Sequence, residues 1–269
     1  MFSPARSDAS SNAGWDRLAN IFAGYDWKIP LILASIIVSQ TPQAFAGSFN
    51  INPIRIQLSS TVKSEVLHVT NTGKTDVTVQ LQPMQWMQRD GEDQLDSTRD
   101  LIATPQIFNL KAGAAQIIRI GLAKKIESAS EAAYRLIVEE IPPPPAPGFQ
   151  GLRLALRVSL PVFVRPEGHV HQSLEAHLTP SSTASAEQIS IELINTGRTH
   201  VQLLHLTIHT ADAQAELLAT LKKNMYLLAG QKKKITLQTK NPIRLTDAVL
   251  IRAETSTGKL ELHAKSASP

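Results

Sequence analysis

The sequence predicts an all-β protein made of two β-sandwich domains that follow an N-terminal export signal. At 269 residues, the chain is long enough for two domains. From Gly47 onward, apolar and polar residues alternate with a period of two over many short segments, which is typical of half-buried strands. A set of motifs also occurs twice in the same order, as expected for two domains of one type.

The alternating segments locate the expected strands. Turn residues separate them at close spacing, which favours sandwiches over alternating strands and helices. One stretch, residues 213–223, is compatible with a helix, and residues 127–133 fit at most a short helical turn. The clearest predicted strands are residues 66–71, 77–81, 117–120, 134–138, 189–193, 201–208 and 234–237.

The internal repeat consists of two pairs of motifs. Residues 69–77 (VTNTGKTDV) resemble residues 193–201 (LINTGRTHV), and in both an apolar strand meets Asn-Thr-Gly, whose glycine tolerates a positive φ in a turn. Further along, residues 110–113 (LKAG) resemble residues 227–230 (LLAG), and an apolar strand follows each. The repeat predicts a first domain over residues 47–165 and a second over residues 166–269.

A short apolar stretch near the N-terminus has the features of a signal peptide. Residues 29–38 are apolar over about ten positions, whereas a membrane-spanning helix needs about 20. Residues 44–46 (AFA) have the small-x-small form of a signal-peptidase site, and Gly47 follows. We therefore expect residues 1–46 to be a signal peptide and the mature chain to be exported. An over-long start or an uncleaved anchor is the alternative.

Composition argues against several classes of function. The chain has no cysteine, so disulfides, zinc ribbons and thiol nucleophiles are excluded. The net charge of +4 is spread along the chain, so nucleic acid is not an expected partner. Neither a GxSxG nor an SxxK motif is present, nor is a phosphate-binding glycine loop, so we expect neither enzymatic activity nor a cofactor.

The histidines are the main candidates for a metal site, since the acidic segment at residues 90–94 lacks the ligand spacing of a calcium loop and is expected to be a hairpin tip. His169 and His171 would share one face of a strand, but no Asp, Glu or His at a known ligand spacing accompanies them. Exposed strand histidines are the preferred interpretation, and a metal site is the alternative. The other histidines weighed are His177, His200, His205 and His209.

Residues 152–164 form an unusually long alternating segment. Every second residue is apolar from Leu152 through Leu154, Leu156 and Val158 to Val164, about twice the usual strand length. One interpretation is a long core strand that runs up to the domain boundary. The other is that its first half is a sheet edge offered to another chain, since a long apolar edge without a purpose is an aggregation hazard.

These features together resemble the PapD-like periplasmic pilus chaperones, especially those of archaic systems that serve spore-coat-U-like pilins. The resemblance implies two immunoglobulin-like sandwiches in a boomerang arrangement. It also implies a periplasmic chaperone that lends a strand to pilus or fimbrial subunits and delivers them to an outer-membrane usher. The motifs that carry it are residues 51–56 (INPIRI), 102–105 (IATP), 110–113 (LKAG), 116–120 (QIIRI), 134–142 (YRLIVEEIP) and 160–166 (LPVFVRP).

The resemblance also implies roles for individual residues. Leu152, Leu154, Leu156 and Val158 would be the donated strand. Arg55 falls on the family's cleft arginine, which holds the carboxylate at the subunit's C-terminus.

At the position of the family's cleft lysine stands Pro161, which cannot replace a cation. Either Arg55 acts alone or another cation serves. Arg157 has the parity of Pro161, but it lies about 13 Å along the strand.

Further family positions concern the contact between domains. Glu131 and Arg165 fall where the family has an interdomain ion pair, with Asp247 as a looser third member. The free protein could protect its apolar edge by self-association. The alternative function, from another class, is a structural or adhesive component of a surface assembly.

Overall fold

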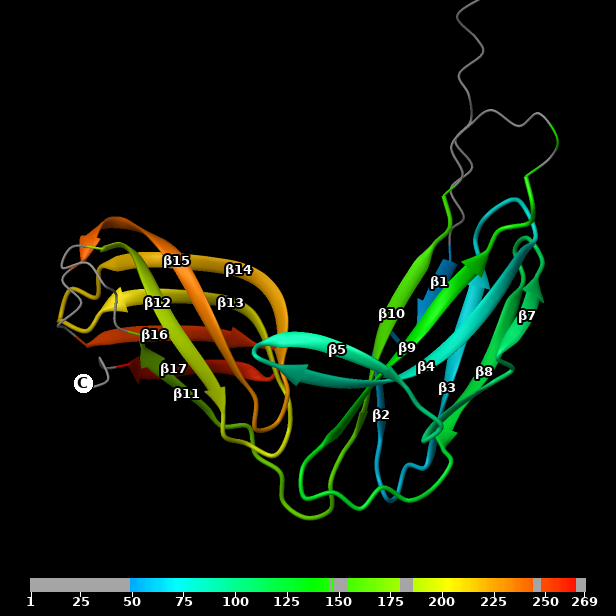
Figure 1. The fold of residues 1–269 in the computed structure, drawn as a ribbon, viewed down its shortest axis with the longest axis horizontal. Coiled ribbons are helices and arrows are strands. Elements are labelled where there is room, and N and C mark those ends of the chain that lie inside the picture. Colours follow the sequence, from blue (N-terminus) through cyan, green and yellow to red (C-terminus); the bar gives the residue numbers. More distant parts are fainter. Residues whose placement is uncertain (1–48, 146, 148–153, 180–185, 244–247, 265–269) are drawn as a thin grey trace, which may run out of the picture. The chain divides into compact units, whose positions relative to one another are not determined.

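The computed structural model describes residues 49–145, 147, 154–179, 186–243 and 248–264. The expected signal peptide, Leu152 and Asp247 lie outside these residues. All regular secondary structure in the described part is β-strand, so the all-β prediction is confirmed (Figure 1). Among the described residues, no helix has the length and apolar character needed to span a membrane.

The first half of the chain forms two facing sheets. Side chains from both sheets make one buried core, so this half is a sandwich as predicted. One sheet has the order β1 (Phe49–Asn52), β3 (Ser64–Asn71), β8 (Ala115–Leu122) and β6 (Leu101–Thr104). The other has the order β2 (Ile56–Leu58), β10 (Arg157–Val164), β9 (Ala132–Ile141), β4 (Val77–Arg89) and β5 (Glu92–Ser97), with β7 (Ile107–Leu110) also paired to β4.

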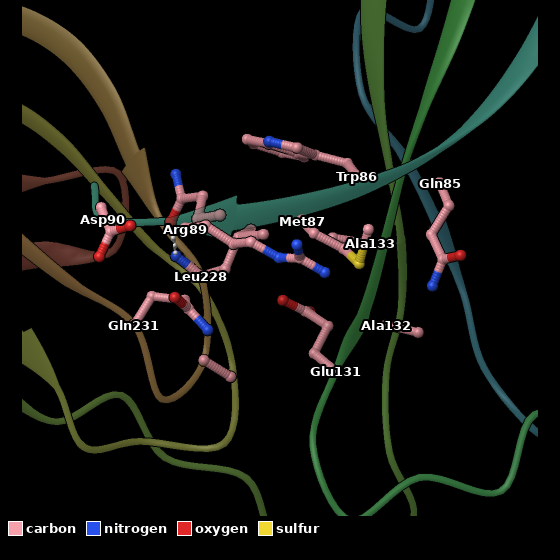
Figure 2. Close-up of a pocket in the computed structure, with 12 residues that line it drawn as sticks. Gln85, Trp86, Met87, Arg89, Asp90, Glu131, Ala132, Ala133, Leu228 and Gln231 are labelled. Atoms are coloured by element: carbon pink, nitrogen blue, oxygen red, sulfur yellow. Dashed lines mark hydrogen bonds between the residues drawn. The ribbon is translucent and has the colours of Figure 1, made fainter. Parts of the chain in front are cut away.

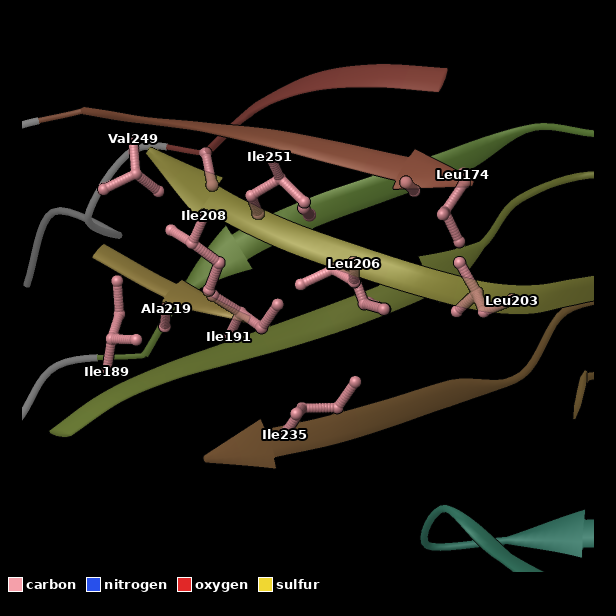
Figure 3. Close-up of a cluster of buried hydrophobic side chains, with 14 of the residues drawn as sticks. Leu174, Ile189, Ile191, Leu203, Leu206, Ile208, Ala219, Ile235, Val249 and Ile251 are labelled. Carbon is pink, nitrogen blue, oxygen red and sulfur yellow. The ribbon is translucent and has the colours of Figure 1, made fainter. Parts of the chain in front are cut away.

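The second half forms a second sandwich, with its own core drawn from both sheets (Figure 3). Its fully buried members include Ile191, Val201 and Ile251. One sheet has the order β11 (Leu174–Leu178), β12 (Ala186–Asn195) and β15 (Lys232–Ile243). The other has the order β14 (Leu217–Leu227), β13 (Val201–Thr210), β16 (Val249–Thr255) and β17 (Gly258–Ala264).

The repeated Asn-Thr-Gly motif has the same structure in both sandwiches. Asn71 and Asn195 are fully buried, and each side-chain oxygen accepts a hydrogen bond from the main-chain N–H of the glycine two residues later. Each side-chain NH₂ donates to main-chain carbonyls of its own loop and of the strand that precedes the second motif. The repeat therefore marks one asparagine-centred loop closure, used once in each sandwich.

The positive φ angles expected in this motif lie in its companion motif instead. Gly113 and Gly230 have φ of 72° and 71°, whereas among the described residues neither Gly73 nor Gly197 has a positive φ. The N–H of Gly113 donates to the carbonyl of Asn71, and that of Gly230 donates to Asn195 in the same way. The left-handed turn thus belongs to the LKAG and LLAG motifs.

The helix expected at residues 213–223 is wrong. Residues 217–227 form β14, which pairs with β13 through two register shifts. Each shift inserts a residue and reverses the phase of the alternation, so the apolar positions imitate a helical period. A turn organised by the Asp212 carboxylate, which accepts hydrogen bonds from the N–H groups of Gln214 and Ala215, precedes the strand.

The long strand expected over residues 152–164 is shorter in the structure. β10 begins at Arg157, and residues 154–156 precede it outside any strand. The partner strand β9 ends at Ile141 and is followed by four prolines, residues 142–145. The last register pair is Arg157 with Glu139, and in the same register Pro142 would be opposite Leu154. Proline has no N–H to donate, so the ladder cannot continue along the prolines.

Candidate functional site

Strand β10 has one open side over its first half. It pairs with β9 along its whole length, but β2 covers its other side only from Val162 to Val164. Within the described part of the chain, no strand pairs with the other side of β10 from Arg157 to Pro161. This segment therefore offers free main-chain groups to a further strand.

Apolar side chains extend in a row along this open segment. Val158 and Leu160 pack on the core of the first sandwich. Leu156 and Leu154, which precede β10, continue the same alternation in the sequence. Leu156 is half-buried, and Leu154 is 57% exposed. The main chain at Leu156 is still held to β9, because its carbonyl accepts from the N–H of Glu140 at 2.9 Å. Leu152, the remaining member of the predicted donor segment, lies outside the described residues.

Arg55 lies in the bend that leads into β2, the strand next to the end of β10. It is exposed and directly precedes β2, whose first residue, Ile56, pairs with Val162 in a parallel register. Arg55 therefore comes one residue before the register partner of Val162, and Pro161 comes one residue before Val162. At the position where the family resemblance requires a second cation stands Pro161, which is buried and uncharged.

A cation that the sequence analysis missed lies directly across from Pro161. Arg135 on β9 is its partner in the antiparallel register. Its guanidinium carbon lies 3.6 Å from the ring centroid of Trp86 and 5.4 Å from that of Tyr226. Among the described residues no carboxylate forms an ion pair with it, and burial lowers the pKa of Arg135, opposed by the more distant Asp93 and by Tyr226.

One signal in the sequence could have identified Arg135. It is a cation within an otherwise apolar strand segment, residues 134–138 (YRLIV). Its neighbours on β9 are deeply buried, and a charged side chain in such a strand needs a special environment. The two aromatic rings supply that environment through cation–π contact, which leaves the positive charge free of a carboxylate.

The aromatic rings around Arg135 belong to a cluster that joins the two sandwiches. Trp86 and Phe163 come from the first sandwich, and Tyr226 and His200 come from the second. Phe163 is fully buried, and its ring stacks on His200 with centroids 3.6 Å apart. Gln88 adds polar contacts between the halves, because its side chain donates to the carbonyl of Tyr226 and accepts from the N–H of Leu228.

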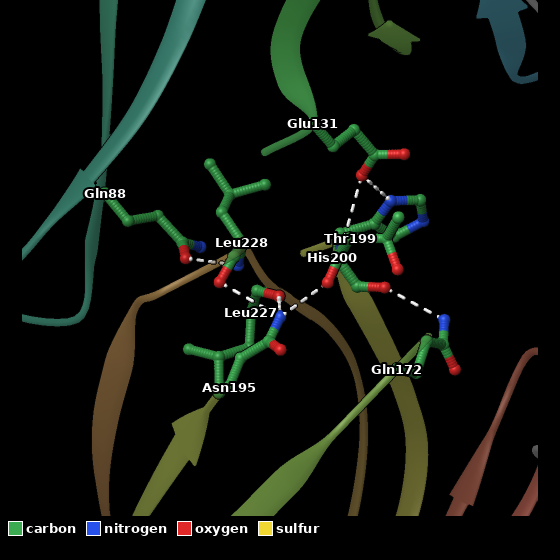
Figure 4. A network of polar contacts seen from close by, with 8 residues as sticks. All are labelled: Gln88, Glu131, Gln172, Asn195, Thr199, His200, Leu227 and Leu228. Atoms are coloured by element: carbon green, nitrogen blue, oxygen red, sulfur yellow. Dashed lines mark hydrogen bonds and ion pairs between the residues drawn. The ribbon is translucent and has the colours of Figure 1, made fainter. Parts of the chain in front are cut away.

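Glu131 also joins the two halves, but its partner is His200 rather than Arg165 (Figure 4). One carboxylate oxygen lies 2.5 Å from Nδ1 of His200 and accepts the main-chain N–H of the same residue at 2.9 Å. Arg165 is exposed, and within the described residues it forms no ion pair with Glu131. In the described residues Glu131 is thus paired with His200, which the loop after β12 carries, and an interdomain role for Arg165 stays a prediction. Asp247, the expected third member of the predicted pair, lies outside the described residues.

A cavity of about 670 Å³ lies beside Glu131 (Figure 2). Trp86 and Arg89 line it from β4, and Leu228 and Gln231 line it from the second sandwich. Two buried polar atoms here, Nε1 of Trp86 and Oε1 of Glu131, have no hydrogen-bond partner among the described residues. The cavity thus borders one unused donor and one unused acceptor.

The histidines do not assemble into a metal site in the described part of the chain. No group of three or more potential ligands lies together there. His209 is held by hydrogen bonds to Ala215 and Thr207, and His200 bonds to Glu131. The acidic segment at residues 90–94 is the hairpin expected from the sequence, with a two-residue turn at Asp90 and Gly91 between β4 and β5.

The fold and this site define a class of protein: paired β-sandwiches in which one sandwich leaves part of a core strand without a neighbour. Residues 48–169 match the family described as the pili and flagellar-assembly chaperone, PapD N-terminal domain. Over these residues the chain is therefore similar to the N-terminal domain of the PapD-like chaperones, and the resemblance drawn from the motifs is confirmed. A comparison with curated protein sequences finds no match.

Solved structures extend the likeness over both sandwiches. A chain of the CsuC–CsuE chaperone–tip adhesion subunit complex from the archaic Csu pili of Acinetobacter baumannii has a TM-score of 0.60 and 21% identity, covering 82% of this chain and 100% of that one. The YadV chaperone gives 0.55 and 18%, covering 80% and 98%. A chain of the Salmonella enterica SafA pilin–SafB chaperone complex gives 0.55 and 15%, covering 82% and 97%. At these identities the likeness establishes the fold.

Proposed function

We propose that this protein is a periplasmic chaperone that captures pilus or fimbrial subunits by donating a strand and passes them to an outer-membrane usher. The observation that carries the proposal is the open side of β10, which is preceded by the exposed Leu154. In this proposal residues 1–46 are the export signal, and residues 47–165 and 166–269 are the two immunoglobulin-like domains. The protein acts by binding and needs neither a cofactor nor catalysis.

The apolar row supplies enough energy for capture. Complete burial of one exposed leucine side chain is worth about 1.5–3 kcal/mol, so Leu152, Leu154 and Leu156 together would contribute at most about 5–9 kcal/mol before ordering costs, and less because Leu156 is already half-buried. Main-chain hydrogen bonds to the open side of β10 would add to this, as in other complexes formed by strand addition. Such a complex is stable, yet it can be transferred without an energy source.

A charge in this row is expected to prevent capture. With Leu154→Asp, a carboxylate would have to enter an apolar groove, so we expect recovery of bound subunit to fall at least about tenfold. The measurement is a pull-down of the tagged protein from its native periplasm, followed by intact-mass analysis for a one-to-one complex. Ile117→Asp is the matched control, because Ile117 is 58% exposed against 57% for Leu154 and lies on the other sheet.

This experiment also separates the proposal from a structural role. A chaperone releases its partner and stays in the periplasm, whereas a structural component remains in the finished assembly. Recovery of the subunit with Leu154→Asp at the level of Ile117→Asp would contradict strand donation at Leu154. Recovery of the protein itself in surface fibres would favour the structural role.

We further propose that Arg55 and Arg135 together bind the subunit's terminal carboxylate. Two observations support this: Arg55 directly precedes Ile56, the register partner of Val162, and Arg135 is the register partner of Pro161 on the opposite side. Arg135 thus takes the place of the cation that Pro161 cannot supply. Two guanidinium groups can hold one carboxylate through charge-assisted hydrogen bonds.

Removal of the second cation is expected to weaken capture. Arg135→Gln should raise the dissociation constant for the subunit about tenfold or more, because a hydrogen bond to a charged group is worth about 1.5–3 kcal/mol. Arg135→Lys keeps the charge and should retain most of the affinity. Arg119→Gln, an exposed arginine on β8, is the control. Equal affinities for Arg135→Gln and Arg119→Gln would rule out this role for Arg135.

A further inference from the structure

A second cavity, of about 840 Å³, lies near the far end of β10 from the proposed donor segment. It forms where three connections of the first sandwich meet a loop of the second. Its walls come from the segment between β2 and β3, the segment between β8 and β9, the residues after β10 and Arg198 between β12 and β13. Neither strand donation nor the Arg55 site uses these residues.

Positive charge dominates the wall of this cavity. Five of the lining residues are cationic, namely Lys63, Lys124, Lys125, Arg165 and Arg198, whereas two are carboxylates, Glu127 and Glu167. Lys125 is already neutralised, because both carboxylates lie within 3.3 Å of its ammonium nitrogen and raise its pKa. Lys124 is paired with Asp100 at 3.0 Å, outside the lining residues.

Three of the cations stand outside these ion pairs. Within the described residues, Lys63, Arg165 and Arg198 form no ion pair. Main-chain contacts hold two of them in place. The N–H of Arg165 donates to the carbonyl of Leu58, which fixes the start of its side chain beside β2.

Arg198 is fixed more tightly, by its own guanidinium. Its Nε donates to the carbonyl of Ala129 at 2.5 Å, and its two terminal nitrogens donate to the carbonyls of His169 and Glu167 at 3.2 Å. These acceptors are neutral, so they orient the guanidinium without cancelling its charge. A guanidinium has five N–H donors, so two remain for another acceptor.

We propose that this cavity binds an acidic peptide segment of a partner protein through Lys63, Arg165 and Arg198. Charge complementarity selects carboxylate side chains. The size of the cavity, and the apolar Leu122, Ile126 and Val164 in its wall, suit a peptide segment rather than a single small anion. The proposal does not depend on strand donation, so either can fail without the other.

The test is a binding titration with a defined acidic peptide. Rhodamine-labelled hexaglutamate is titrated with the full chain and followed by fluorescence anisotropy, with hexaglutamine as the uncharged counterpart. We expect hexaglutamate to bind and hexaglutamine not to bind. The double variant Lys63→Gln/Arg165→Gln should weaken hexaglutamate about tenfold, since each exposed ion pair is worth up to about 1 kcal/mol.

The control removes the same charge elsewhere. Lys74→Gln/Lys259→Gln replaces two exposed lysines outside the cavity and leaves the net charge equal to that of the test variant. If the control weakens hexaglutamate as much as the test variant, attraction to the overall charge explains binding and the proposal is wrong. It is also wrong if inorganic phosphate displaces the peptide at equal concentration, or if only anionic phosphatidylglycerol vesicles bind in a manner that depends on Lys63 and Arg165.

Discussion

Replacement of Asn195 by alanine is expected to lower the free energy of unfolding of the second sandwich by about 3 kcal/mol. The buried side chain donates to the carbonyls of Thr199, Leu227 and Leu228 and accepts from the N–H of Gly197. Two of these groups keep another partner, because the N–H of Gly197 also donates to Ser173 and the carbonyl of Leu228 also accepts from Gln231. The carbonyls of Thr199 and Leu227 lose the bond from Asn195, and a buried main-chain group left without a partner costs about 1–3 kcal/mol. The loop that presents His200 would lose its anchor.

Urea unfolding measures this change, and hydrogen exchange at the Gly197 and Gly230 amides locates it. Asn195→Asp should be at least as damaging, because a carboxylate would face three carbonyl oxygens. Thr196→Ala, next to it but exposed, is the control and should change stability by less than about 0.5 kcal/mol. Asn71→Ala should destabilise the first sandwich less, since Asn71 donates to two carbonyls. Equal stability of Asn195→Ala and Thr196→Ala would contradict this role of the amide.

The motifs that closed loops within one sandwich could be predicted from sequence. In each sandwich the glycine N–H donates a hydrogen bond to the asparagine carbonyl, and both residues lie in short segments that the repeat makes visible. The sequence alone does not show which glycine adopts a positive φ. Both Asn-Thr-Gly and Leu-Lys-Ala-Gly fit a tight turn, and only the pairing of Gly113 with the Asn71 carbonyl decides between them.

The residues at which a strand begins and ends depend on its neighbouring strands, which the alternation of apolar and polar residues does not reveal. The four prolines after Ile141 were visible in the sequence, but their effect on β10 follows only once β9 is known to be its partner. In β14, two register shifts against β13 disturbed the alternation and produced a false helical period. Both errors come from the interaction between strands rather than from the propensity of either segment.

Contacts between the sandwiches were the least predictable part of the candidate site. The sequence predicts an interdomain role for Glu131, but its partner His200 lies 69 residues away in the sequence. The sequence shows Arg135 as a cation in an apolar segment, but its role follows from its position opposite Pro161 and its contacts with Trp86 and Tyr226. Such pairs are set by registers and packing across the whole molecule, and no local pattern encodes them.

We expect a single substitution at the contact between Glu131 and His200 to destabilise the protein, and a matched substitution of both residues to be tolerated. Their side chains are 2% and 7% exposed, so His200→Phe would leave a buried carboxylate without its ring partner. Loss of one member of such a pair typically costs about 3–5 kcal/mol, whereas apolar replacement of both members is often nearly neutral. We therefore expect Glu131→Leu/His200→Phe to be more stable than His200→Phe alone.

The geometry favours this recovery. Phenylalanine at position 200 keeps the stacking on Phe163, and leucine at position 131 removes the carboxylate that would otherwise be unpaired. One cost remains, because the main-chain N–H of residue 200 loses its acceptor, worth about 1–3 kcal/mol. Urea unfolding of the two single variants and the double variant gives the coupling free energy, and hydrogen exchange at the amide of residue 200 reports the contact itself. If His200→Phe and the double variant prove equally stable, the carboxylate is not buried against His200, and the link between the two sandwiches must rest on Gln88 and the aromatic cluster.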